Sequence, residues 1–445
     1  MYSKNDVAPF PPMGWNSYDY YNTIVTEEDV RRNADYMASH LKEHGWEYVV
    51  VDIQWSDPNA GSTCPQIQYV PFTHFCLDEY SRQIPAENRF PSSKGGKGFK
   101  PLADYIHNLG LKFGIHIMRG VPRYAAHTHM SVMGTDLTAD KIANPFSVSK
   151  WNGDMYGLLT DTEAHLKGAG AYYDSIFALY AEWGVDFVKV DDICNTNMYP
   201  NDPYSAQKEI ELISEAIEKC GRPMVLSLSP GPAVIEKAWH LEQHANMWRI
   251  TDDFWDKWEL LRAMFERCEV WQNHVGGGSW PDCDMIPLNL LSKGFGAERN
   301  TNFTRAEERT MFTLWSIFRS PLILGTELPL LDEESLALIT NDEVLALNRH
   351  SHGAVQVRRN EEECVWQSFG DGCPARGQAL FLALFNLSET ERDISVDLKK
   401  IRGIKEKNTY TPRNLWKKED LFPVQGNALL SFTVAPHDAL LLKLN

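Results

Sequence analysis

The sequence predicts an α/β fold in which a (β/α)8 TIM barrel is followed by a C-terminal antiparallel β-sandwich domain. Over the first 350 residues, short apolar runs alternate with helical stretches, a pattern typical of βαβ units in a parallel sheet. More than five such units favour a closed barrel over an open sheet. From about Asn348, short strand-like runs broken by Gly, Pro and Asn are typical of a sandwich. We therefore expect a barrel over 1–350 and a sandwich over 351–445.

Each element follows from its pattern of apolar residues. Amphipathic helices are predicted at 30–44, 101–109, 172–183 and 206–220. The strands that follow these helices are predicted at 46–52, 111–118, 185–191 and 223–229. Strands of the sandwich are predicted at 354–357, 363–369, 379–386, 394–398 and 439–444. Two long insertions, 56–100 and 121–168, come after strands, so we expect them on the loop face where barrel enzymes hold their sites.

The charge of the chain argues against several classes of partner. Its 445 residues include 60 acidic and 43 basic ones, for a net charge of −17. Neither nucleic acid nor an anionic membrane surface is an expected partner, because binding to either needs clustered Lys and Arg. The start of the chain lacks an apolar signal segment, and the chain lacks any apolar run of about 18 residues, so we expect a cytoplasmic protein.

The eight cysteines are sparse, and none of them forms a Cys-x-x-Cys pair. Cys64 with Cys76, and Cys364 with Cys373, are close enough in sequence to bridge in an oxidising compartment, whereas free thiols are expected in the cytoplasm. The histidines show no metal-binding spacing either. The sequence therefore predicts neither a metal nor another cofactor.

Acidic side chains end several of the predicted barrel strands. Val188 and Val190 share one side of their strand, and an apolar side suits the layer between barrel and helices. The opposite side, with Lys189 and Asp191, is therefore expected to face the barrel interior at its carboxyl-terminal mouth. Other polar residues expected at this mouth are Asp52, Trp55, Arg249, Thr251 and Asp253.

Paired carboxylates in an aromatic-walled cavity suit acid/base or nucleophile/acid cleavage of glycosidic bonds. The residues alone leave another interpretation open, because Lys189 beside Asp191 also fits a structural ion pair. Loop carboxylates are, moreover, common in a chain with 60 acidic residues. On spacing alone, the sequence predicts a barrel hydrolase that acts on carbohydrate.

Six motifs follow one another along the barrel region. They are Pro12-Met-Gly-Trp-Asn-Ser-Tyr, Val51-Asp-Ile-Gln-Trp, Lys189-Val-Asp-Asp, Trp248-Arg-Ile-Thr-Asp-Asp, Trp280-Pro-Asp-Cys-Asp-Met and Ser320-Pro-Leu. Together they resemble the ordered motifs of glycoside hydrolase family 27, the α-galactosidase and α-N-acetylgalactosaminidase family. The resemblance implies a retaining exo-glycosidase that removes terminal α-D-galactosyl or α-N-acetylgalactosaminyl residues by double displacement.

The resemblance also implies roles for individual residues. Asp191 matches the nucleophile and Asp253 the acid/base, while the adjacent Asp192 and Asp252 are the competing assignments. In a retaining enzyme the two carboxyl groups stand about 5–5.5 Å apart. The substrate-binding residues that the resemblance implies are Trp15, Asp52, Trp55, His116, Lys189, Ser229, Arg249 and Asp284.

Within that set, Lys189 and Arg249 would hold sugar hydroxyls and keep the nucleophile ionised, because a nearby cation lowers the pKa of a carboxylate. Trp15 would wall the pocket. Asp52 and Asp284 would accept hydrogen bonds from ring hydroxyls.

Three departures from the family pattern concern specificity. Ile53 stands where the family usually has a second acid, which removes an acceptor for the 4- or 6-hydroxyl, and His116 stands where the family usually has Tyr. Ser229 is small where α-galactosidases place a bulky acid, so we expect α-N-acetylgalactosaminides to react within about tenfold of α-galactosides. Ile53 suggests a β-L-arabinopyranosidase as an alternative. An inactive glycan-binding protein is the alternative outside the enzymes.

Overall fold

The computed structural model describes residues 3–61, 73–149, 152–196, 201–370 and 379–445. Eight parallel strands form the barrel: β1 (Met13–Asn16), β2 (Tyr48–Val51), β3 (Lys112–Met118), β7 (Phe187–Asp191), β8 (Val225–Leu228), β9 (Met247–Arg249), β10 (Trp280–Asp282) and β13 (Leu322–Leu324). They are hydrogen-bonded in the order β10-β9-β8-β7-β3-β2-β1-β13. Just past β10, Ile286 pairs in parallel with Leu324 of β13, and this bridge joins the two ends of the sheet.

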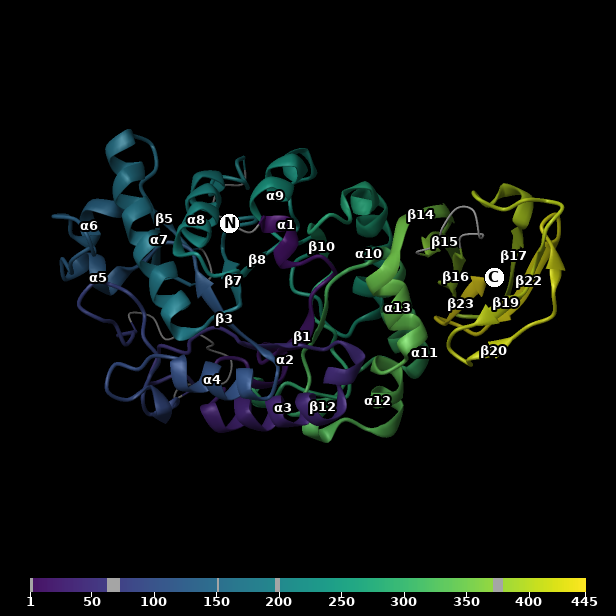
Figure 1. Ribbon diagram of the computed structural model, residues 1–445, viewed down its shortest axis with the longest axis horizontal. Coiled ribbons are helices and arrows are strands. Elements are labelled where there is room, and N and C mark those ends of the chain that lie inside the picture. The colour runs from purple at the N-terminus through teal and green to yellow at the C-terminus, as the bar shows by residue number, and fades with distance from the viewer. Residues whose placement is uncertain (1–2, 62–72, 150–151, 197–200, 371–378) are drawn as a thin grey trace.

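Helices connect successive strands and surround the barrel (Figure 1). They are α3 (Glu27–His40), α4 (Lys100–Asn108), α7 (Glu163–Trp183), α8 (Gln207–Cys220), α9 (Ala238–His244), α10 (Trp258–Trp271), α11 (Arg305–Phe318) and α13 (Asp342–His350). Shorter elements are α1 (Lys4–Val7), α2 (Tyr18–Tyr21), α12 (Glu333–Ile339), β11 (Leu290–Leu291) and β12 (Arg299–Asn300). The fold class predicted from the sequence is confirmed.

Helix α7 begins nine residues before the predicted start. Thr162 caps it by accepting a hydrogen bond from the amide of His165. Gly168 lies inside the helix where a Cβ would come within 2.9 Å of the Ile142 side chain, so close packing favours a glycine there despite its poor helix propensity. The early turns are polar and glycine-containing, which is why periodicity alone does not reveal them.

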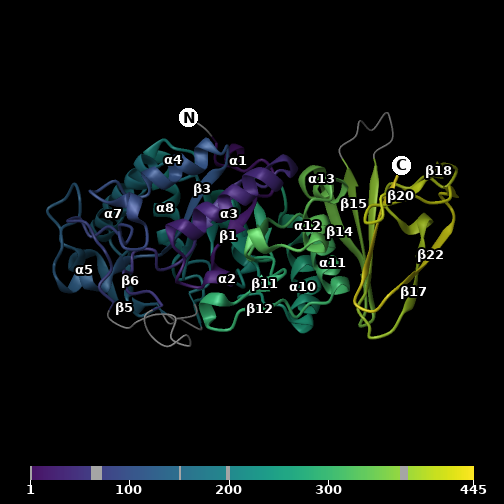
Figure 2. The same cartoon turned by 90° about the horizontal axis from the view of Figure 1, so that it is seen from below.

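The insertion that follows β3 forms a small subdomain. It contains α5 (Arg123–His127), α6 (Ala139–Ile142) and a three-stranded sheet of β4 (Val121–Pro122), β6 (Met155–Leu158) and β5 (Ala143–Val148). Figures 1 and 2 show this subdomain at the end of the molecule opposite the sandwich.

The carboxyl-terminal part is a sandwich of antiparallel strands. Its larger sheet contains β14 (Ser351–Arg359), β15 (Glu363–Gly370), β16 (Leu380–Asn386), β23 (Ala439–Leu444), β19 (Pro412–Asn414) and β20 (Glu419–Asp420). The opposing strands pair as β17 (Arg392–Asp397) with β22 (Leu429–Val434) and β18 (Thr409–Tyr410) with β21 (Val424–Gln425).

Strand β16 is buried on both faces because it lies between two cores. Phe381, Ala383 and Phe385 belong to the core shared with the barrel helices, whereas Leu382 and Leu384 face the interior of the sandwich. Figure 2 shows the larger sheet lying between the barrel helices and the outer strands. The sandwich is therefore packed firmly against the barrel.

Two findings concern the other expectations from the sequence. Among the described residues, no helix is both long and apolar enough to cross a membrane. Cys64 and Cys373 lie outside the described residues. The structure therefore does not describe the suggested bridges of Cys64 with Cys76 and of Cys373 with Cys364.

Truncating Phe385 should weaken the junction between the two domains. Its ring makes an edge contact with Phe265 of α10 at 4.9 Å between centroids, and both side chains are fully buried. We expect Phe385→Ala to lower the free energy of unfolding by about 3–5 kcal/mol, measured by urea denaturation. Phe422→Ala is the matched control, since Phe422 is 90% exposed and its loss should cost less than about 0.5 kcal/mol. Equal effects of the two changes would contradict the packing described here.

Candidate active site

In five of the barrel strands, an apolar side chain inside the barrel is followed two residues later by a polar one. The apolar floor contains Val50, Phe187, Val225, Met247 and Trp280. The residues two positions further on are Asp52, Lys189, Ser227, Arg249 and Asp282. Alternate residues of a strand point to the same face, so these polar side chains form one layer above the floor. In β7, Val188 and Val190 lie in the core between the barrel and the helices. Lys189 and Asp191, on the other side of the strand, therefore face the barrel interior, as the sequence predicts.

An ion pair between Lys189 and Asp52 lies in this layer. The Nζ of Lys189 donates to Oδ2 of Asp52 at 3.0 Å, and Nδ2 of Asn16 donates to the same oxygen at 2.7 Å. The amide of Ile53 donates to Oδ1 of Asp52 at 2.8 Å. Burial alone would raise the pKa of Asp52, but the charge of Lys189 and these donors outweigh it, so the pKa lies well below its usual range. Asp52 is therefore ionised.

Asp191 ends β7, and each of its two carboxylate oxygens has a partner. His116 of β3 places Nε2 at 3.2 Å from Oδ2, and the amide of Asp192 donates to Oδ1 at 2.8 Å. Burial would raise the pKa of Asp191, but the contact with His116 and the charge of Lys189 lower it below its ordinary value. A buried carboxylate that stays ionised has the property that a nucleophile needs.

Arg249 connects two further acids. One guanidinium nitrogen pairs with Oδ1 of Asp284 at 2.7 Å, and another donates to Oδ1 of Asp253 at 3.1 Å. Asp284 is buried, and its Oδ2 accepts the amide of Phe254 at 2.7 Å. The Asp253 side chain is 61% exposed, against 15% for Asp191. The two predicted catalytic acids therefore differ sharply in their access to water.

The competing assignments lie differently. The Asp192 carboxylate is buried and pairs with Arg119 at 3.2 Å. Asp252 is exposed. Asp253 contacts Arg249 of the polar layer, which is the contact expected of the interior-facing acid.

Three of the predicted sugar-binding residues lie apart from this cluster. Trp15 is fully buried in the helix-side core, and its Nε1 donates to the carbonyl of Thr326 at 2.7 Å. Trp55 is buried as well, and its Nε1 donates to the carbonyl of His116 at 2.6 Å. Ser229 is 1% exposed, with Oγ at 3.5 Å from the carbonyl of Val190. These residues support the site from behind, whereas the structure brings together Asp52, His116, Lys189, Asp191, Arg249, Asp253 and Asp284.

Tyr18 is an aromatic residue beside the site that the sequence analysis did not select. It is half-buried, and the Nζ of Lys189 lies 5.8 Å from the centre of its ring. It follows β1, where Asn16 faces Asp52 and the neighbouring Trp15 faces the other way. The same Trp-Asn-Ser-Tyr run contains both aromatic residues, but Tyr18 is the first residue of α2, so the alternation of β1 gives no signal for it.

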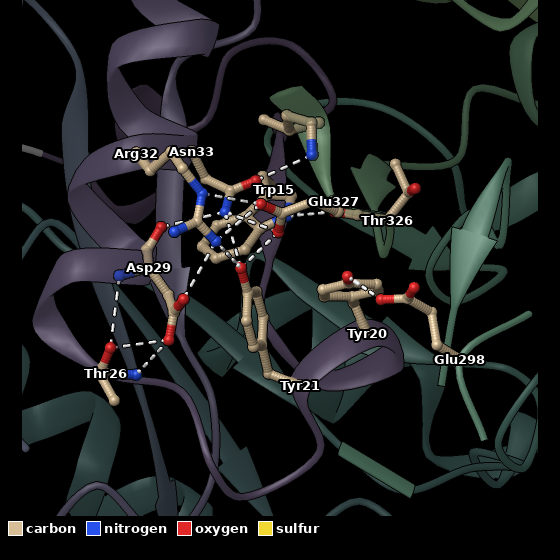
Figure 3. A network of polar contacts seen from close by, with 11 residues as sticks. Trp15, Tyr20, Tyr21, Thr26, Asp29, Arg32, Asn33, Glu298, Thr326 and Glu327 are labelled. Carbon is tan, nitrogen blue, oxygen red and sulfur yellow. Dashed lines mark hydrogen bonds and ion pairs between the residues drawn. The ribbon is translucent and has the colours of Figure 1, made fainter. Parts of the chain in front are cut away.

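The one-turn helix α2, which carries Tyr18, is fixed by contacts with distant residues (Figure 3). The hydroxyl of Tyr20 donates to Glu298, and that of Tyr21 donates to Glu327. Glu327 also pairs with Arg32 of α3 at 2.9 Å. These acids come from loops late in the sequence, so α2 cannot be predicted from local propensity.

Asp19, on the same helix, is a second residue that the sequence analysis missed. It is 2% exposed, and its Oδ2 has no hydrogen-bond partner among the described residues. This oxygen packs against Gly325, where a Cβ would come within 2.1 Å of it. Burial, together with the negative charge of Asp284, raises the pKa of Asp19 well above its usual value. We therefore expect Asp19 to retain its proton more readily than an ordinary aspartate does.

A protonated Asp19 makes stability depend on pH in a definite direction. With a raised pKa, Asp19 keeps its proton in the folded chain at pH values where the unfolded chain has released it, that is, above about pH 4. The stability of the wild-type protein should therefore fall as the pH rises above about 4. Asp19→Asn removes this titration while keeping the shape. We expect its stability advantage over wild type to grow between pH 5 and pH 8, by up to about 1.4 kcal/mol per pH unit in urea denaturation. A difference that stays constant with pH would show that Asp19 is ionised in the folded protein.

Comparisons with known proteins agree with this arrangement. A model of α-galactosidase A matches residues 153–350, and a model of the α-galactosidase C-terminal β-sandwich domain matches residues 374–444. Alpha-galactosidase 3 of Arabidopsis thaliana is 25% identical over 425 residues, which cover 94% of this chain and 78% of the relative.

Two solved structures are more similar in sequence. A β-L-arabinopyranosidase of glycoside hydrolase family 27 from Geobacillus stearothermophilus is 52% identical, with a TM-score of 0.92 over 99% of this chain and 98% of that one. A variant of that enzyme has been solved in complex with arabinose. A candidate α-N-acetylgalactosaminidase from Bacillus halodurans is 46% identical, with a TM-score of 0.85 over 98% and 97% of the two chains. The chain described here therefore belongs to glycoside hydrolase family 27, and it is a glycoside hydrolase.

Proposed function

We propose that this chain is a retaining exo-glycosidase that removes terminal β-L-arabinopyranosyl residues, with α-D-galactosides as weaker substrates. β-L-Arabinopyranose and α-D-galactopyranose share the arrangement of their ring hydroxyls and differ by the hydroxymethyl group that galactose carries. The ring hydroxyls find polar partners in the layer that contains Asp52, Lys189 and Arg249. Specificity then depends on what faces the position of the hydroxymethyl group.

The observation that carries this proposal is the apolar environment of Ile53. Ile53 directly follows Asp52 and clusters with Phe75, Met118 and Met155, with Tyr18 packed against them. Such a wall accepts a ring that ends at C5, but it offers no hydrogen bond to a 6-hydroxyl. Burying that hydroxyl without a partner costs about 1–3 kcal/mol, which disfavours galactosides. The Geobacillus relative supports the same substrate.

In the proposed mechanism Asp191 attacks the anomeric carbon while Asp253 protonates the leaving oxygen. The glycosidic bond breaks as the bond to Asp191 forms. Asp253, now ionised, takes a proton from water, which attacks the anomeric carbon and releases Asp191. The donors on both oxygens of Asp191 keep it ionised and oriented, and the exposure of Asp253 admits water and the leaving group. His116 contributes a hydrogen bond and Lys189 a positive charge that keep the nucleophile ionised.

Removal of the nucleophile tests this assignment. Asp191→Ala should lower kcat on 4-nitrophenyl β-L-arabinopyranoside by more than about 10³-fold, because no covalent intermediate can form. Azide should fill the space left by the carboxylate and restore turnover, giving a glycosyl azide of inverted configuration that NMR identifies.

The neighbouring acids provide matched controls for this experiment. Asp253→Ala should also be impaired, most of all on substrates with poor leaving groups, whereas Asp252→Ala should keep activity within about threefold of wild type. Wild-type rates in Asp191→Ala, or an inverted product from the wild-type enzyme, would refute the mechanism.

A change at Ile53 tests the specificity. Ile53→Asp should raise the ratio of kcat/KM for α-D-galactoside to that for β-L-arabinopyranoside by at least about tenfold, since it supplies an acceptor for the 6-hydroxyl. Ile53→Asn supplies an acceptor without a new charge and should move the ratio in the same direction. Ile53→Leu keeps the apolar wall and should leave the ratio unchanged. An unchanged ratio in all three variants would mean that Ile53 does not face this position.

A second candidate function is hydrolysis of α-N-acetylgalactosaminides, which the 46% identical Bacillus halodurans relative favours. Including the 4-nitrophenyl glycoside of this sugar in the same panel decides between the two. Ser229→Glu should suppress this activity selectively if Ser229 borders the 2-position of the sugar.

A further inference from the structure

A buried cluster of charges lies directly behind Asp191, and the proposed mechanism does not use it. Its centre is Arg119, whose side chain is 2% exposed. Arg119 directly follows β3, and β3 is hydrogen-bonded to β7 in the barrel sheet. Nothing in the motifs of the sequence analysis includes this residue.

Arg119 contacts the Asp191–Asp192 dipeptide at three points. Its amide donates to the carbonyl of Asp191 at 3.0 Å. Its Nε donates to the carbonyl of Asp192 at 2.5 Å, and Nη2 pairs with Oδ2 of Asp192 at 3.2 Å. The guanidinium presents Nε and Nη2 in one rigid plane, so these two contacts fix the orientation of the dipeptide as well as its position.

That orientation determines a hydrogen bond to the nucleophile. Asp192 has a φ of +57°, in the left-handed region that residues other than glycine rarely adopt. In this conformation its amide donates to Oδ1 of Asp191 at 2.8 Å. The other carboxylate oxygen of Asp191 is contacted by His116. The carboxylate plane of Asp191 is therefore set by one donor from β3 and one from the turn that Arg119 holds.

The remaining contacts of Arg119 anchor it without touching Asp191. Nη1 donates to Oε1 of Glu209 in α8 at 2.9 Å, and the hydroxyl of Tyr173 in α7 donates to Oε2 of Glu209 at 2.6 Å. The insertion after β3 covers the cluster, since a Cβ on Gly157 of β6 would come within 1.9 Å of the Arg119 guanidinium. Arg119 is thus held in place by two helices and the subdomain.

We propose that Arg119 is a positioning residue for the nucleophile: by holding the Asp191–Asp192 turn, it aims the Asp192 amide at Oδ1 of Asp191. The inference rests on the proposed role of Asp191 as the nucleophile. It gives the buried cluster and the insertion that seals it a function in catalysis rather than in stability alone.

Arg119→Lys tests this proposal because it keeps the positive charge and removes the rigid set of donors. We expect kcat on 4-nitrophenyl β-L-arabinopyranoside to fall about 10- to 100-fold, because a nucleophile displaced by a fraction of an ångström reacts more slowly. KM and the inhibition constant of free L-arabinose should stay within about twofold. Tyr173→Phe is the matched control, since it removes two hydrogen bonds of the same cluster, one to Glu209 and one from the amide of Gly120, without touching Asp191 or Asp192. Its kcat should stay within about twofold of wild type.

A readout independent of turnover separates this proposal from the proposed function. Hydrogen–deuterium exchange of the peptide over 188–196 should speed up at least about fivefold in Arg119→Lys and stay unchanged in Tyr173→Phe. A wild-type enzyme that cleaves no glycoside of the panel would refute the proposed function, yet the exchange result would still decide whether Arg119 holds the turn.

A further variant covers the possibility that Arg119→Lys does not fold, which a thermal melt would reveal. Asp192→Asn keeps a side chain that tolerates the left-handed conformation and replaces by an amide the carboxyl group that Arg119 contacts, so it should reproduce the fall in kcat at constant KM. The proposal is overturned if the folded variants keep kcat and exchange within twofold of wild type, or if Tyr173→Phe loses as much activity as Arg119→Lys.

Discussion

The site depends on a shortage of positive charge in a buried space. Lys189 and Arg249 face Asp52, Asp191, Asp253, Asp282, Asp284 and Asp19 across the mouth of the barrel. A buried carboxylate stays ionised only where a cation or several donors reach it. Asp52 and Asp191 have both, and their pKa values are lowered. Asp19 has an oxygen without a donor, and its pKa is raised. Asp284 pairs with Arg249, yet burial and the neighbouring acids raise its pKa to about 7, so two cations do not offset the burial of every acid in the site.

The sequence predicts the features that depend on local periodicity. Valines 188 and 190 identify the helix side of β7, and this alone places Lys189 and Asp191 inside the barrel. The break in pattern near Asn348 lies close to the change from α13 to β14 at 350–351. The family resemblance then supplied the candidate roles of Asp253 and Arg249, which the parity of that strand also placed at the mouth of the barrel.

Features that depend on contacts between distant residues could not be predicted in this way. Helix α2 forms because Glu298 and Glu327 accept hydrogen bonds from its tyrosines, and neither acid is near α2 in sequence (Figure 3). Without that helix there was no reason to choose Tyr18 over Trp15 as the aromatic residue of the site. A single sequence likewise cannot show that Arg119 and Asp192 are partners, because they are 73 residues apart.

The two catalytic acids of the proposed mechanism differ because their tasks differ. The nucleophile must meet one carbon atom in one geometry, so it profits from burial and from donors on both oxygens, and it has them in His116 and the Asp192 amide. The acid/base must reach leaving groups of varied shape and then a water molecule, so it needs an open position. At 61% exposure, Asp253 has that position, and Arg249 keeps it near the polar layer by a single contact. The fold therefore places its rigidity on the β3–β7 side of the barrel, where the insertion seals the Arg119 cluster. Asp253 follows β9, two strands along the sheet from β7, and there the site is open to water.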